Sequence, residues 1–157
     1  MHAQTDIVGT VAHRHQPRWA AAWGIAAGLV LMAVLVEYHT ILTGQGGPGG
    51  QPSTRVAFIS AYIVGVAAVA FAAAGCLMTD RSAPARPLFM ASASGAVVLG
   101  IAGMFSIGIG LFGAVAMQLA AAGRAPAHAY DRRVQMTTAL LVALPPIALV
   151  AGLALTS

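Results

Sequence analysis

Glu37 and His39 are the residues of this sequence whose types and spacing are best suited to chemistry. A glutamate near a histidine can relay protons or hold a cation, and an ionisable residue inside a membrane span is a functional candidate by default. Both residues follow an apolar run that begins at Trp19 and reaches about 27 Å by Val36, at ~1.5 Å per residue. We therefore expect them at a membrane interface, where solvation alone can accommodate them.

A second polar group lies between two apolar runs and consists of His128, Tyr130, Asp131, Arg132 and Arg133. A solvated loop beside a membrane span explains it without catalysis. The sequence has no Walker loop, no G-x-S-x-G or H-E-x-x-H motif, and no Cys/His cluster around its one cysteine. We expect no enzyme activity, no catalytic residues, no bound metal and no cofactor.

The composition shows what kind of molecule carries these residues. Of the 157 residues 59% are hydrophobic and 8% charged, with a mean hydropathy of +0.82, whereas soluble domains average about 25% charged residues. A soluble fold of this size has too little interior for so much apolar surface. The net charge of +4 comes from arginines scattered between apolar runs, which is typical of membrane flanks and not of a nucleic-acid interface.

The apolar runs alternate with segments rich in Gly, Pro and Arg, which predicts an all-α, polytopic transmembrane helix bundle. We expect residues 1–18 to form a flexible cytoplasmic tail and residues 19–157 a single transmembrane domain. Pro145 and Pro146 are expected to kink the last helix. The predicted spans are about 19–42, 56–78, 88–104, 109–122 and 134–155.

The uncharged stretch 87–123 determines the number of crossings. It is too long for one span and barely long enough for two, so a hairpin turning near residues 105–108 competes with one long tilted helix. Four crossings divide the arginines equally between the two sides, whereas five place seven on one side and leave Arg55 alone on the other. The positive-inside rule therefore favours five crossings. The residues expected to set this topology are Arg14, Arg18, Arg81, Arg86, Arg132 and Arg133.

Small residues recur at spacings that place them on one helix face, which lets helix backbones approach closely. The residues expected to serve helix packing are Gly24, Gly28, Gly65 and Gly100. Such faces are compatible with a compact bundle and with a homo-oligomer.

The chain resembles small multi-pass membrane proteins of high-GC bacteria to which no function is assigned. The resemblance lies in the loop Gly46-Gly47-Pro48-Gly49-Gly50, in Ser53-Thr54-Arg55 and in the segment from Gly103 to Gly108. It implies an integral membrane protein and brings no catalytic residue with it.

Two functions from different classes remain. The first is a structural or accessory protein of the bacterial cytoplasmic membrane, with a cytoplasmic N-terminus, that associates with itself or with a larger membrane partner. The second is a small homo-oligomeric transporter or channel, which needs polar groups facing one another at depth. Its pathway residues would be Glu37, His39, Ser60, Ser92, Ser94 and Ser106. The scarcity of charge within the spans favours the accessory role.

Overall fold

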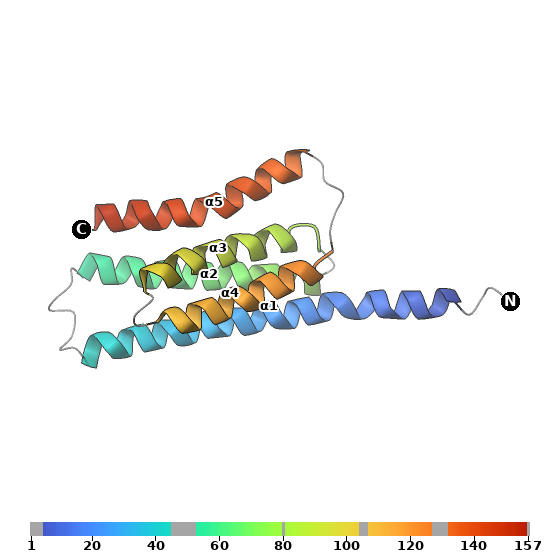
Figure 1. The fold of residues 1–157 in the computed structure, drawn as a ribbon, viewed down its shortest axis with the longest axis horizontal. Coiled ribbons are helices and arrows are strands. Elements are labelled where there is room, and N and C mark those ends of the chain that lie inside the picture. The colour runs from blue at the N-terminus through green and yellow to red at the C-terminus, as the bar shows by residue number, and fades with distance from the viewer. Residues whose placement is uncertain (1–4, 45–52, 80, 104–106, 127–131, 157) are drawn as a thin grey trace.

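The computed structural model describes residues 5–44, 53–79, 81–103, 107–126 and 132–156. Within these ranges the chain forms five α-helices and no strand, which confirms the predicted all-α bundle (Figure 1). The helices are α1 Thr5–Gly44, α2 Ser53–Met78, α3 Ala85–Ala102, α4 Gly108–Arg124 and α5 Arg132–Leu155.

Four of these helices contain stretches long and apolar enough to cross a membrane. The stretches are Arg18–Gly44, Ser53–Met78, Ala85–Ala102 and Gln135–Leu155. Helix α4 is also apolar, but its 17 residues extend only about 25 Å at ~1.5 Å per residue, slightly less than a bilayer core. The chain is therefore a multi-pass, membrane-associated helical protein.

The central apolar stretch is a hairpin of α3 and α4, as the arginine distribution predicted, and the alternative of one long helix is wrong. The carbonyl oxygen of Gly103 accepts hydrogen bonds from the N–H groups of Ile107 and Gly108, both at 3.0 Å, which closes the turn. A Cβ atom at Gly108 would lie 3.2 Å from the carbonyl oxygen of Gly100, so glycine lets the two arms approach closely. Ser106 lies outside the described residues.

The N-terminal segment differs from its prediction. Helix α1 begins at Thr5, whereas a flexible tail was expected up to residue 18. Once the apolar span is helical, each further residue adds one backbone hydrogen bond without a new nucleation step. The span itself begins at Arg18, next to the predicted start, so the extra turns extend α1 beyond the rest of the bundle (Figure 1).

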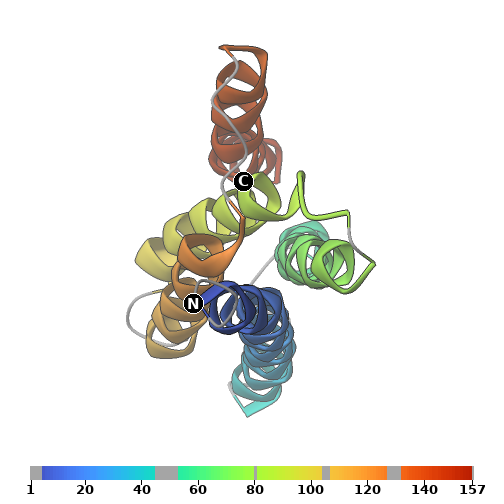
Figure 2. The same ribbon diagram turned by 90° about the vertical axis from the view of Figure 1, so that its right-hand side faces the viewer.

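Helices α1 to α4 form a closed ring in which each packs against two others: α1 on α2 and α4, and α3 on α2 and α4. Helix α5 lies outside this ring and packs mainly on α3, with a smaller contact to α2 (Figure 2). Its outward face exposes large apolar side chains, among them Met136, Leu140, Leu144, Ile147 and Val150. This face is suited to lipid.

The interior of the bundle divides into two clusters of buried side chains. One contains large residues from all five helices, among them Leu31, Ile63, Leu99, Leu111 and Leu149. The other contains residues from α1, α2, α3 and α4 and consists mostly of alanine packed around the fully buried ring of Phe89. Small side chains there let the helices approach closely, in keeping with the rule for packing in membranes.

Candidate functional site

The ends of the helices gather at two poles of the bundle. The C-terminal ends of α1 and α5, the start of α2 and the turn between α3 and α4 lie together at one pole, which we call the hairpin end (Figure 1). The opposite pole holds the α2–α3 connection and the C-terminal end of α4, and we call it the arginine end. Both candidate residues predicted from the sequence, Glu37 and His39, lie toward the hairpin end.

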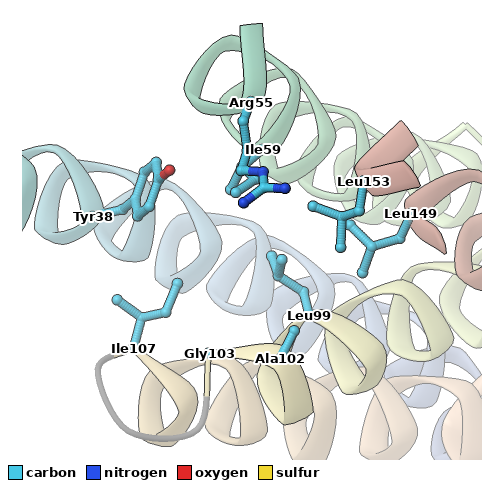
Figure 3. A pocket seen from close by; sticks show the side chains of 9 residues that line it. All are labelled: Tyr38, Arg55, Ile59, Leu99, Ala102, Gly103, Ile107, Leu149 and Leu153. Carbon is cyan, nitrogen blue, oxygen red and sulfur yellow. The ribbon is translucent and has the colours of Figure 1, made fainter. Parts of the chain in front are cut away.

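A pocket of about 370 Å³ opens between the helices at the hairpin end. Its lining is mostly aliphatic, with one tyrosine and one arginine (Figure 3). The lining residues are Tyr38, Arg55, Ile59, Leu99, Ala102, Gly103, Ile107, Leu149 and Leu153. They come from α1, α2, α3, the hairpin turn and α5, so the pocket exists only because the chain returns to this end several times.

Arg55 and Tyr38 supply the polar atoms of this pocket. Figure 3 shows the guanidinium group of Arg55 reaching from α2 into the pocket and the ring of Tyr38 on the α1 side. The Nε atom of Arg55 and the hydroxyl of Tyr38 are both buried and have no hydrogen-bond partner. Buried polar groups are almost always hydrogen-bonded, so two unpartnered donors in one pocket call for an explanation.

His39 points to a different neighbour. Its Nε2 atom lies 3.1 Å from the hydroxyl oxygen of Ser60 in α2, and its ring meets that of Tyr38 edge-on at 5.7 Å. Because the hydroxyl of Ser60 donates to the carbonyl oxygen of Val56 at 2.8 Å, its oxygen is left to accept from Nε2 in the tautomer that carries its hydrogen there. Glu37 is exposed on the surface of α1. The structure thus joins His39 to Ser60 and places Glu37 outside this contact.

A buried polar pair lies deep in the ring. Gln118 of α4 is fully buried, and its Nε2 donates to the hydroxyl of Ser92 in α3 at 2.9 Å. The hydroxyl of Ser92 donates in turn to the carbonyl oxygen of Val66 in α2 at 2.8 Å. The Oε1 atom of Gln118 has no partner. This chain of bonds links α4, α3 and α2 through buried polar groups.

The kink of α5 is bound by two further hydroxyls. Tyr62 of α2 donates to the carbonyl oxygen of Pro145 at 3.0 Å and lies 3.4 Å from that of Gly95. The hydroxyl of Ser94 in α3 lies 2.8 Å from the carbonyl oxygen of Val142 in α5 and 2.8 Å from that of Ala91 in its own helix, so its one hydrogen is shared between them. Pro146 has no N–H to donate to the carbonyl of Val142, and carbonyl groups freed in this way are commonly satisfied by hydroxyls of neighbouring helices. The bond from Tyr62 to the carbonyl of Pro145 is a further link between α2 and α5.

The glycines singled out for helix packing lie in different surroundings. A Cβ atom at Gly24 would meet the ring of Phe89, and one at Gly28 would lie 2.6 Å from the ring of Phe71. At Gly100 it would make ordinary contact with Leu111, on the other arm of the hairpin. Gly65 has nothing within 4 Å.

The arginines are distributed unevenly between the two poles. Arg18, Arg81, Arg86 and Arg124 lie at the arginine end, and Arg55 lies at the hairpin end. Arg14, Arg132 and Arg133 belong by backbone position to the arginine end as well, in the extension of α1 and the first turn of α5. The rest of the predicted polar loop, residues 128–131, lies outside the described residues.

Sequence reasoning did not single out Arg55, Tyr38, Tyr62 or Gln118 as functional residues. Arg55 did carry a signal, because it is the one arginine left apart from the other seven in a five-crossing topology. No sequence pattern brings Tyr38 and Arg55 to one pocket, since their placement depends on how α1 and α2 pack.

No group of three or more His, Cys, Asp or Glu side chains that could hold a metal ion occurs within the described ranges. Comparison with known proteins gives no match to any family, curated protein or solved structure. The geometry of the chain itself is therefore the basis for inferring what it does.

Proposed function

We propose that this chain is a structural or accessory protein of the bacterial cytoplasmic membrane, without enzyme activity, that crosses the bilayer five times and associates with itself or with a larger membrane partner. The observation that carries the proposal is how the bundle uses its interior hydroxyls. Ser92, Ser94 and Tyr62 each donate to a backbone carbonyl of a neighbouring helix. These side chains join helices, which is a structural use of polarity in a membrane.

The competing proposal of a small transporter or channel has less support. A pathway needs polar groups that face one another at depth and stay available to a permeating species. Ser92 and Ser94, two of its predicted lining residues, are engaged with helix backbone, while Glu37 is exposed at the bundle surface. Each of these positions is better explained by packing or by interfacial solvation.

The orientation belongs to the same proposal. Seven of the eight arginines lie in segments at the arginine end, so the positive-inside rule assigns that end to the cytoplasm. The N-terminus then lies in the cytoplasm, and the hairpin end, including the C-terminal end of α5, lies on the outer side. Helix α4 is short for a span, but local thinning of the bilayer accommodates a mismatch of a few Å at modest cost.

A flux assay separates the accessory role from the transporter. The full-length protein, reconstituted in liposomes, is expected to pass protons and monovalent cations no faster than liposomes without protein. Flux that Glu37→Gln abolishes would overturn the accessory role. In parallel, cross-linking in native membranes is expected to trap a homo-oligomer or a stoichiometric partner, and a chain that remains monomeric and alone at its native abundance would contradict the proposal.

A further inference from the structure

We propose that the pocket at the hairpin end binds an anionic amphiphile, whose carboxylate or phosphate head lies against Arg55 and Tyr38 and whose alkyl chain lies along Leu99, Leu149 and Leu153. The inference concerns a binding site and stands independently of the accessory role.

The polar part of the pocket is suited to an anion. The structure describes three buried side-chain polar atoms without a hydrogen-bond partner, and two of them, Arg55 Nε and the Tyr38 hydroxyl, belong to residues that line this pocket. Arginine carries only donors, arranged in a fork that fits carboxylate and phosphate oxygens, and a phenol can donate as well. No described side chain forms an ion pair with Arg55. An anionic head group in the pocket would balance the charge of Arg55, and both donors would be satisfied once the two side chains turn toward it.

The rest of the lining is suited to an alkyl chain. Beyond Arg55 and Tyr38 the lining residues carry aliphatic side chains or none, and they come from α2, α3, the hairpin turn and α5. The volume of about 370 Å³ lies at the lower end of the range of small-molecule pockets, ~300–1,000 Å³. This space accommodates one chain and not a whole two-chain lipid. Small-molecule pockets combine an apolar wall with few placed polar groups in the same way.

The position of the pocket fits a ligand that enters from the membrane. Arg55 is in the first turn of α2 and Tyr38 is less than two turns from the end of α1, so both lie near the level of the head groups. The aliphatic side chains of Leu99 and Leu149 belong to the buried cluster of the bundle. A ligand bound in this way keeps its head at the interface and its tail in the apolar interior, as it does in a bilayer.

Helix α5 is the reason that the space exists. It packs on α3 and makes only a smaller contact with α2, so its C-terminal half forms one wall of the pocket without closing it. Leu149 and Leu153, which form this wall, follow the Pro145-Pro146 kink by one to two turns. The direction of α5 after its kink therefore sets the width of the pocket.

Native mass spectrometry of the full-length protein in neutral detergent tests the proposal. The probes are palmitate, lysophosphatidate, phosphatidylglycerol and an uncharged monoacylglycerol. We expect one anionic molecule per chain, and binding about tenfold or more weaker in Arg55→Gln, since a hydrogen bond to a charged group is worth ~1.5–3 kcal/mol and 1.4 kcal/mol is tenfold. The matched control is Arg124→Gln, which removes an exposed arginine at the opposite pole and should leave binding unchanged.

A second variant tests the apolar half without disturbing the core. Ala102 lines the pocket but is exposed, so Ala102→Phe should fill the space and weaken binding, while Ala116→Phe on the exposed face of α4 should not. If phosphatidylglycerol binds in a manner that depends on Arg55, the natural ligand is a membrane lipid. If only palmitate or lysophosphatidate binds in this manner, the natural ligand is a free single-chain amphiphile. Equal losses in Arg55→Gln and Arg124→Gln, equal binding of the uncharged probe, or several equivalent sites per chain would each overturn the proposal.

Discussion

The hydroxyl of Ser94 in α3 donates a 2.8 Å hydrogen bond to the carbonyl oxygen of Val142 in α5, the carbonyl that Pro146 leaves without its helical donor. Proline at position 146 thus creates an acceptor within α5, and the neighbouring helix satisfies it. The contact joins the outlying helix to the ring at the point where α5 is weakest as a helix.

This relationship predicts a coupling between the two residues. Ser94→Ala should lower the unfolding free energy by roughly 1 kcal/mol, because the carbonyl of Val142 loses its donor in an apolar medium. In a Pro146→Ala background the helix restores a donor to that carbonyl, and the same serine substitution should cost clearly less. Thermal unfolding of the four proteins in detergent measures the coupling. Strictly additive effects would show that Ser94 does not compensate for Pro146.

The buried pair of Gln118 and Ser92 yields an asymmetric prediction. Ser92→Ala removes the partner of a fully buried amide and should destabilise the protein by about 1–3 kcal/mol. Gln118→Leu removes the amide, including its unpartnered Oε1 atom, and keeps the side-chain size and the bond from Ser92 to Val66. It should change stability by less than about 1.5 kcal/mol. Chemical denaturation of both variants checks this order; a larger loss for Gln118→Leu would contradict it.

Two glycines in different surroundings provide a matched pair. Gly24→Ala places a methyl group against Phe89, which is fully buried, and 3.2 Å from the Cβ of Ala74, so we expect a loss of about 1–3 kcal/mol. Gly65→Ala enters open space on α2 and should be neutral or gain up to about 1 kcal/mol from helix propensity. Melting temperatures in one detergent compare them directly. A similar gain at both positions would indicate that helix propensity and not packing governs these sites, and a similar loss at both would contradict the open surroundings of Gly65.

The proposed orientation predicts which ends of the helices face outward. In a Cys76→Ala background, Thr156→Cys at the end of α5 should react with a membrane-impermeant thiol reagent on intact cells. Thr79→Cys, at the arginine end beside α2, should react only after lysis. The reverse pattern would show that the protein has the opposite orientation in the membrane. Labelling of both residues from the same side would contradict the placement of the C-terminal ends of α2 and α5 on opposite sides.

The sequence predicted the helices and the hairpin well because both follow from strong, additive signals. The length of an apolar run indicates a membrane span. The separation of Arg55 from the other seven arginines favours two crossings, and not one, for the stretch 87–123. The start of α1 was mispredicted because polar residues ahead of a span carry no strong signal for or against helix. The pocket was not predictable: Tyr38 and Arg55 come to line one pocket through the packing of α1 on α2, which single-sequence patterns do not encode.

The exclusion of α5 from the ring has a consequence for the order in which the protein is made. Synthesis proceeds from the N-terminus, so α1 to α4 leave the ribosome before α5 and can close their ring before α5 docks. Ser94 and Tyr62 are then already in place on a finished surface when the kinked helix arrives. Helix α5 then docks on a surface that earlier segments form, and the pocket is complete only once α5 supplies its wall.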